Sequence, residues 1–180
     1  VVPYLDREIF LIHDGDDISL PHRSLVTSAV MELSGAGVFS SAARLFGGGP
    51  RTLLSVYPFP HSCYNLLNPA AGIRRSEFVR LGGYRDFGSA DRNKASLDTE
   101  LWLRVRQAGV RVAVSSAELV RYRQHPQSCV HNATTGFASA ARQFVERKYA
   151  AVCNGPPVKG SLSRCKGLLK YVHRISVADT

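Results

Sequence analysis

Three carboxylates stand within four residues, directly after a short apolar run. Asp14, Asp16 and Asp17 follow the apolar segment 8–13. Carboxylates this close repel one another unless a cation neutralises them. Hard divalent ions such as Mg²⁺ and Mn²⁺ take oxygen ligands, and a site with few carboxylates leaves coordination positions for substrate phosphates. The pattern fits a Mg²⁺ or Mn²⁺ site, and it fits equally an aspartate-rich turn in which Asp17 caps the following helix.

Two further residues could take part in chemistry, one at a helix start and one in a loop. Asp98 stands at the start of the helix predicted over 97–108, where a carboxylate caps the helix well. If partly desolvated, it could also act as a general base. His125 precedes Pro126, and imidazole binds borderline metals, although a single histidine in a loop is more often simply solvated.

These residues need a scaffold that brings them together, and the hydrophobic pattern predicts an α/β fold. The segment 8–13 has four consecutive apolar residues, 9–12, without polar alternation, which is typical of a central strand covered on both faces. Residues 47–69 carry four of the nine prolines, so we expect them to be mostly irregular, and 84–96 to be a loop. Helices are predicted over 21–34, 76–81, 97–108, 137–151 and 162–175, and strands over 38–42, 71–74, 110–114 (an edge strand) and 119–123.

Composition and charge limit the class of protein. The 180 residues are 44% hydrophobic and 21% charged, which is a globular composition, and no run of eighteen apolar residues could cross a membrane. The four cysteines are too scattered for a metal knuckle, and we expect free thiols in a reducing compartment. The net charge of +9 favours anionic partners without choosing among them. No signal peptide is visible in the segment that opens at Val1, so we expect a cytoplasmic protein and treat the sequon at Asn132 as chance.

Five motifs, taken in order, resemble the inverting glycosyltransferases of family 2, which have the GT-A fold. The resemblance covers about residues 5 to 130. It implies a nucleotide-sugar donor, such as a UDP-sugar, bound together with a divalent metal ion. The motifs are Asp-Gly-Asp-Asp-Ile-Ser-Leu-Pro (14–21), Arg-Arg (74–75), Leu-Gly-Gly-Tyr-Arg (81–85), Leu-Asp-Thr-Glu-Leu-Trp-Leu-Arg (97–104) and Tyr-Arg-Gln-His-Pro-Gln-Ser (122–128).

The resemblance assigns the donor side of the site to the acidic segment. Asp14, Asp16 and Asp17 would bind the donor, and Asp16 would also hold Mg²⁺ or Mn²⁺. His125 looks like the family's C-terminal loop histidine and would be a second metal ligand. We therefore expect Asp14, Asp16 and His125 to converge, because this fold brings the C-terminal loop back over the strand that ends at Asp14.

The resemblance assigns the acceptor side to two later motifs. Asp98 would be the catalytic base, although Leu97 stands where the family has a glutamate. Gly83, Tyr84 and Trp102 would contact the acceptor, which would be a saccharide or a lipid-linked molecule. The implied reaction is a single displacement that inverts the configuration at the anomeric carbon.

The resemblance also predicts how the chain is divided. Residues 1–150 would be the C-terminal part of a GT-A domain, incomplete at its N-terminus because the family's nucleobase-binding strand and glycine loop do not precede Val1. Residues 151–180 would form a basic amphipathic helix or tail. That helix packs on the domain, or it lies on an anionic membrane surface and makes the protein peripheral to the membrane. We expect no nucleic-acid partner.

Two other functional classes remain open. A truncated, non-catalytic remnant of such an enzyme could serve as a binding or interaction module, and such a remnant need not bind a nucleotide-sugar. Phosphatases of the haloacid dehalogenase type also use a strand ending in Asp-x-Asp. They expect a later lysine and a second acidic pair after a strand, whereas Asp86, Asp91 and Asp98 are predicted in loop or helix-start positions.

Overall fold

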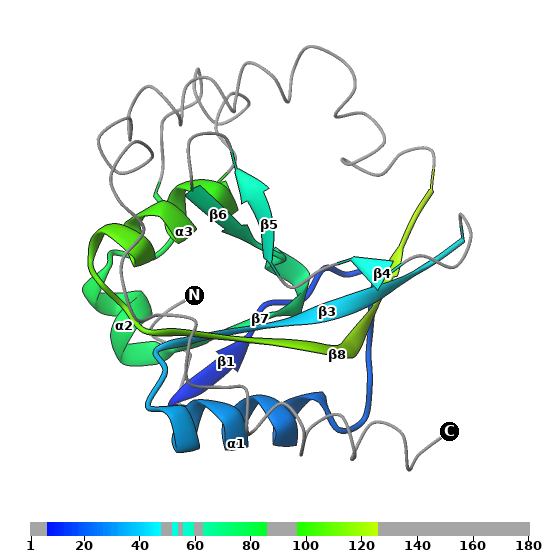
Figure 1. Cartoon of the computed structure of the whole chain (residues 1–180), viewed down its shortest axis with the longest axis horizontal. Helices are drawn as coiled ribbons and strands as arrows, with labels where there is room; N and C mark the ends of the chain where they lie inside the picture. Colours follow the sequence, from blue (N-terminus) through cyan, green and yellow to red (C-terminus); the bar gives the residue numbers. More distant parts are fainter. Residues whose placement is uncertain (1–6, 48–51, 54–55, 60–62, 86–96, 126–180) are drawn as a thin grey trace.

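The computed structural model describes residues 7–47, 52–53, 56–59, 63–85 and 97–125 (Figure 1). Within them the chain forms a mixed α/β fold, as the sequence predicts. The predicted helices over 137–151 and 162–175 lie outside the described residues.

Eight strands and three α-helices make up the described structure. The strands are β1 (Ile9–Leu11), β2 (Ile18–Ser19), β3 (Val38–Phe46), β4 (Thr52–Leu53), β5 (Val56–Phe59), β6 (Cys63–Leu66), β7 (Ala71–Arg74) and β8 (Val112–Arg123). The α-helices are α1 (Arg23–Ser34), α2 (Arg75–Arg80) and α3 (Leu97–Gln107), and a 3₁₀ turn, η2, covers Asn68–Ala70.

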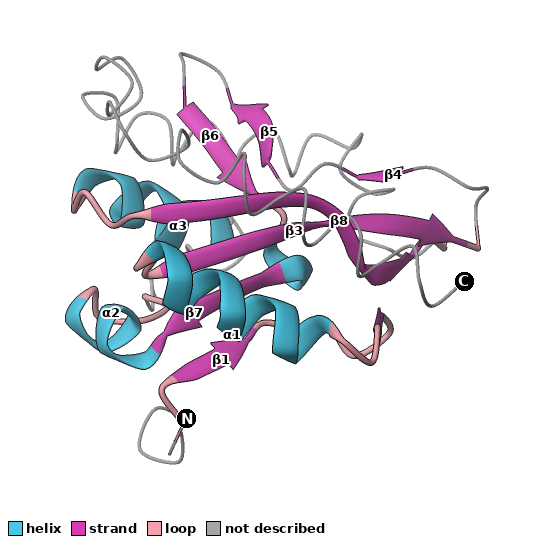
Figure 2. Ribbon diagram, turned by 60° about the horizontal axis from the view of Figure 1, so that its bottom comes forward, coloured by secondary structure: helices cyan, strands magenta, loops and turns pink. Residues whose placement is uncertain are grey.

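One curled sheet of six strands carries the site. Five strands follow the order β1-β7-β3-β8-β2, and β4 pairs with β3. The central β3–β8 pairing is parallel and the other pairings in this sheet are antiparallel. β5 and β6 form a separate hairpin. In Figures 1 and 2, α1 covers one face of the six-stranded sheet, while α2 and α3 lie on the other.

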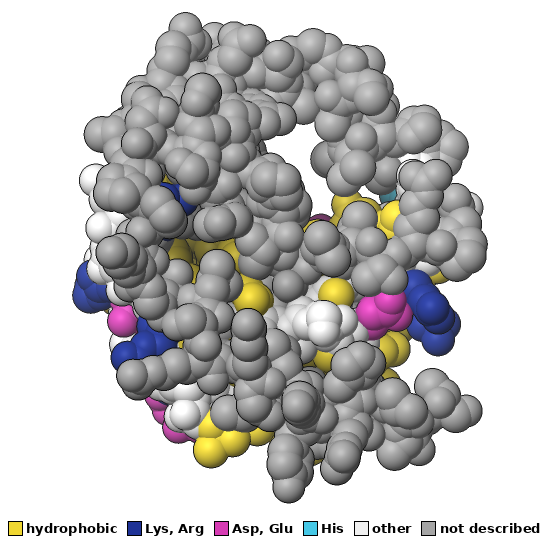
Figure 3. Space-filling model, viewed as in Figure 1, with side chains coloured by type: hydrophobic (Ala, Val, Ile, Leu, Met, Phe, Trp, Pro, Cys, Tyr) yellow, Lys and Arg dark blue, Asp and Glu magenta, His cyan; other side chains and the backbone are white. Residues whose placement is uncertain are grey.

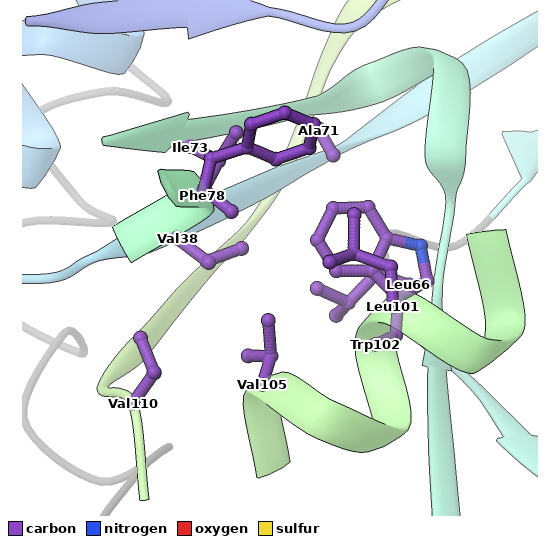
Figure 4. Close-up of a cluster of buried hydrophobic side chains, with 9 residues drawn as sticks. All are labelled: Val38, Leu66, Ala71, Ile73, Phe78, Leu101, Trp102, Val105 and Val110. Atoms are coloured by element: carbon purple, nitrogen blue, oxygen red, sulfur yellow. The ribbon is translucent and has the colours of Figure 1, made fainter. Parts of the chain in front are cut away.

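The two faces of the sheet build two cores, because successive side chains of a strand point to opposite faces. Phe39 packs with Val26, Val30 and Met31 of α1, whereas its neighbour Val38 packs with residues of α2 and α3. Figure 4 shows the second core. Its members are Val38, Leu66, Ala71, Ile73, Phe78, Leu101, Trp102, Val105 and Val110.

Several predicted elements are confirmed, and four predictions are wrong. The strands over 38–42 and 71–74 and the helix from Leu97 are present, and Gly35 and Gly109 follow their helices with φ of 62° and 65°. β1 is not a central strand in the described sheet. It lies at one end of the strand order and is half-buried, because it pairs with β7 alone among the described strands.

The other three corrections concern β8, the hairpin and α1. The two strands predicted over 110–114 and 119–123 are one strand, β8, which lies between β3 and β2 rather than at an edge. Residues 47–69 contain β4 and the β5–β6 hairpin despite their prolines. The helical spacing of Val26, Val30 and Leu33 predicts Leu33 on the buried face of α1, but Leu33 is 71% exposed and Met31 is buried instead.

Several charged side chains on the described surface form ion pairs. Arg44 and Glu118 lie 3.2 Å apart, and Arg80 and Glu77 lie 2.6 Å apart. On the face seen in Figure 3, acidic side chains likewise lie next to basic ones. Like charges gather instead at residues 14–17, described below.

Candidate functional site

The acidic segment forms a turn between β1 and β2. The Asp17 N–H donates to the Asp14 carbonyl at 3.1 Å, which closes the turn. β2 then pairs antiparallel with β8, with Ile18 opposite Arg121. Extending this register by two residues places Asp16 opposite Arg123. The pairing of one short strand therefore brings the acidic turn to the C-terminal end of β8.

Side-chain contacts confirm this placement. The Arg123 N–H donates to Asp17 Oδ1 at 2.9 Å, and Arg123 Nε donates to the Asp16 carbonyl at 3.0 Å. His125 Nε2 lies 3.0 Å from Asp16 Oδ2. The expectation that His125 returns to the acidic turn is confirmed for Asp16, 109 residues away in the sequence.

A divalent ion is the implied cofactor at this turn, and the donor chemistry fits one. Asp16 offers a carboxylate oxygen and His125 an imidazole nitrogen at the same point. Among the described residues, no group of three or more His, Cys, Asp or Glu is placed to hold a metal. A cation bound here would therefore complete its coordination with water or substrate oxygens, which is how Mg²⁺ is usually held beside phosphates.

Two carboxyl groups of the acidic turn, those of Asp14 and Asp17, have raised pKa values. Burial raises the pKa of Asp14, and the charges of Asp16 and Asp98 raise it further. Burial also raises the pKa of Asp17, and the N–H of Arg123 opposes this by donating to its carboxylate. A raised carboxyl pKa marks a place where negative charge is costly, so a cation at the turn would be stabilised.

The second half of the site is an open pocket of about 350 Å³ at the start of α3. Its lining includes Asn68, Tyr84, Leu97 and Asp98. The Tyr84 hydroxyl donates to Asn68 Oδ1 at 3.4 Å. Burial, followed by the charge of Asp98, raises the pKa of Tyr84 to about 12, and Asp14 contributes in the same direction. Asp14 and Asp98 therefore act on the same phenol, one from each half of the site.

A buried ion pair holds the loop that carries Tyr84. Glu100 and Arg104 are 0% and 4% exposed and lie 2.6 Å apart. Arg104 also donates to the carbonyls of Leu81 and Gly83. The guanidinium of Arg104 therefore attaches this loop to α3, because it offers several N–H donors in one fixed plane.

Aromatic packing fixes the ring of Tyr84. It meets Phe78 edge-on, with centroids 5.6 Å apart, and Phe78 meets Phe10 of β1 in the same way at 5.0 Å. Gly83 has φ of 60°, and a Cβ there would lie 3.0 Å from the Phe78 ring. Only glycine fits this position without strain.

Of the three residues expected at the acceptor, only Tyr84 lines the pocket in the described structure. Gly83 is buried behind it. The expectation for Trp102 is wrong, because its side chain is 2% exposed and lies in the core with Leu66 and Leu101 (Figure 4). The middle of α3 is buried on nearly all sides, so an aromatic residue there supports the pocket from behind.

Sequence reasoning missed two residues of the site, Arg23 and Asn68. Asn68 precedes Pro69 in η2, and this Asn-Pro pair is a turn signal that does not point to a pocket. Arg23 is the first residue of α1, where a cation opposes the helix dipole. That mismatch is the signal that could have singled it out.

Comparison with known proteins finds neither a matching family model nor a curated protein of similar sequence. No helix in the described parts of the chain is both long and apolar enough to cross a bilayer. The assignment of function therefore depends on the geometry of the site.

Proposed function

We propose that the protein is a metal-dependent, inverting glycosyltransferase of the GT-A type, which transfers a sugar from a nucleotide-sugar to an acceptor hydroxyl. The observation that carries the proposal is the contact between Asp16 Oδ2 and His125 Nε2, 3.0 Å apart, which brings the first and the last of the five motifs to one point. The charge of Asp98 on α3 also contributes to the raised pKa of Asp14, after burial and the charge of Asp16. The mixed sheet with helices on both faces is compatible with the proposed fold.

The acidic turn would bind the donor. Asp14 would contact its ribose or sugar, Asp17 would support the turn through the N–H of Arg123, and Asp16 with His125 would hold Mg²⁺ or Mn²⁺ on the diphosphate. When bound, such an ion supplies neutralisation of the negative charge that builds on the departing diphosphate. The ligand atoms would be Asp16 Oδ2 and His125 Nε2, which lie 3.0 Å apart.

Asp98 would accept the proton of the acceptor hydroxyl. As that oxygen forms its bond to the anomeric carbon, the bond from this carbon to the diphosphate oxygen breaks on the opposite side. The proton passes to the Asp98 carboxylate, and the configuration inverts. Tyr84, whose pKa of about 12 keeps the phenol neutral, would face the acceptor with its ring and hydroxyl.

The substitution Asp98→Asn tests the proposal. Asn is nearly isosteric and can occupy the first turn of α3, but it cannot accept the proton. We expect transfer to fall by about a hundred- to ten-thousand-fold, with donor binding nearly unchanged. Transfer is measured with UDP-sugars and Mn²⁺, and donor binding by isothermal titration calorimetry.

Glu77→Gln is the matched control, because Glu77 also lies in the first turn of a helix, α2, and does not line the pocket. It should leave transfer unchanged. Full activity of the Asn variant would reduce Asp98 to a helix-start residue. A chain that binds no nucleotide-sugar with Mn²⁺ would instead fit the non-catalytic binding module.

A further inference from the structure

Arg23 is a cation buried beneath the acidic turn. Its side chain is 1% exposed, and burial lowers its pKa to about 10, so it stays charged at neutral pH. Among the described residues no carboxylate forms an ion pair with it. It also opens α1, where a positive charge opposes the helix dipole. Both the burial of this charge and its position at the start of α1 are unfavourable. A charged residue kept in such a place is expected to have a specific structural or functional role.

The contacts of Arg23 show what that demand is. Nη2 donates to the Ile12 carbonyl at 2.7 Å and to the Ala71 carbonyl of β7 at 3.3 Å. Nη1 donates to Ser19 Oγ at 2.8 Å and lies 3.3 Å from His13 Nδ1. Ile12 and His13 precede the acidic turn, and Ser19 follows it. One guanidinium therefore grips the chain on both sides of the turn.

Only an arginine can make both grips. Its guanidinium presents five N–H donors in one rigid plane, so two nitrogens can bind groups on different segments. The ammonium of lysine is a single point on a flexible stem and can satisfy one side of the turn at a time. The substitution Arg23→Lys keeps the positive charge but removes the planar set of donors. It therefore separates the effect of the charge from the effect of the hydrogen-bond geometry.

We propose that Arg23 is a positioning residue, which clamps the acidic turn in the shape that brings Asp16 to His125 and Asp17 to the Arg123 N–H. The use of this turn in donor binding rests on the proposed function. The clamp itself does not, because it follows from the contacts of Arg23 alone.

Amide hydrogen exchange measured by NMR on the full chain tests the clamp without metal or substrate. The probes are the amides of Asp17 and Arg123, which donate to the Asp14 carbonyl at 3.1 Å and to Asp17 Oδ1 at 2.9 Å. In Arg23→Lys we expect both to exchange at least about tenfold faster, because a charge-assisted grip on one side of the turn is lost. The amides at the other end of the β3–β8 pairing, Val112 to Val114, should be unchanged.

Arg74→Lys is the matched control. Arg74 also donates to backbone carbonyls, those of Ala36 at 3.1 Å and Met31 at 3.4 Å, but it lies away from the acidic turn. Its replacement should leave the amides of Asp17 and Arg123 unchanged. Ser19→Ala, which removes one side of the grip and keeps Arg23, should speed the same two amides and provides a second test if Arg23→Lys does not fold.

Unchanged exchange at Asp17 and Arg123 in the folded variants would overturn the clamp. Equal acceleration at all amides would also overturn it, because that result describes a residue that stabilises the fold without shaping the turn. The transfer assay with Asp98→Asn decides the proposed function separately, so failure of one proposal does not imply failure of the other.

Discussion

Two buried arginines support the two halves of the candidate site, and they are neutralised in different ways. Arg104 forms an ion pair with Glu100 one helical turn away and holds the loop that carries Tyr84. Arg23 has no such pair among the described residues. The charge of Asp17, on the turn that Arg23 supports, is what favours its protonated form.

This difference separates a rigid half from a responsive half. Glu100 neutralises Arg104 within α3 and also forms an ion pair with Arg85 of the Tyr84 loop at 3.4 Å, so these internal contacts should keep the loop in shape whatever binds nearby. In the other half of the site, the charge of Asp17 in the acidic turn stabilises the protonated form of the buried Arg23. A cation or a proton that arrives at the turn therefore changes the energetics of Arg23 as well, and this half should respond to ligands and pH.

The largest expected effect comes from removing Glu100, which forms ion pairs with Arg104 and Arg85. Glu100→Ala leaves the Arg104 guanidinium buried without its carboxylate, which typically costs about 3–5 kcal/mol of folding free energy. In a chain of this size we expect the melting temperature to fall by about 6–20 °C. Glu32→Ala is the control, because Glu32 forms its ion pair with Arg74 at the surface, with a side chain 61% exposed. It should cost less than about 1 kcal/mol, and an equal loss in both variants would contradict the comparison.

A smaller effect is expected from the glycines of the Tyr84 loop. Gly82 and Gly83 have φ of 80° and 60°, a conformation that costs other residues about 1–2 kcal/mol. A Cβ on Gly83 would also lie 3.0 Å from the Phe78 ring, whereas no described atom lies within 4 Å of one on Gly82. Gly83→Ala should therefore destabilise the fold by about 1 kcal/mol more than Gly82→Ala in urea unfolding. Equal losses would show that Phe78 moves aside at no cost.

The smallest effect tests the responsive half through pH. Burial and neighbouring carboxylates raise the pKa of Asp14 in the folded state. The protonated form is thus favoured by folding, and stability is lost as pH rises through the folded-state pKa. Asp14→Asn removes that loss, so its melting temperature should exceed the parent's by about 1–3 °C at pH 7. At pH 3 the two proteins should melt together, and a gain of equal size there would assign the effect to something other than charge.

The sequence predicts the parts of the fold that depend on local pattern. The apolar runs of β3 and β7 and the amphipathic start of α3 are visible from residue types alone. The joining of 110–114 and 119–123 into β8 is not, because Ser115 and Ser116 interrupt the apolar pattern where the β3–β8 register shifts. The β5–β6 hairpin is hidden by the prolines, which normally mark irregular chain.

The site divides in the same way. Asp14, Asp16, Asp98 and His125 have the residue types and order that predict a site, and the structure brings Asp16 to His125. Arg23, Glu100 and Arg104 could not be predicted as buried, because charged residues are normally exposed and only the tertiary partners show otherwise. For Trp102 the error is the opposite one. Its place in a motif suggests an exposed contact with the acceptor, whereas the middle of α3 is buried and its side chain lies in the core.

The contact between Asp16 and His125 also has a consequence for how the chain folds and unfolds. It joins residues 109 positions apart, and the strand that brings them together, β2, has two residues. Bringing together segments so distant in sequence costs chain entropy, and the few contacts of β2 offset little of that cost. We therefore expect this pairing to be among the first to open and the last to form. A ligand that bridges Asp16 and His125 would bind only the state in which β2 is paired with β8. At a hundred times its dissociation constant it would add about 2.7 kcal/mol to the free energy of unfolding. Saturation of the site would thus slow the opening of β2 and protect the chain from proteases that attack the open form.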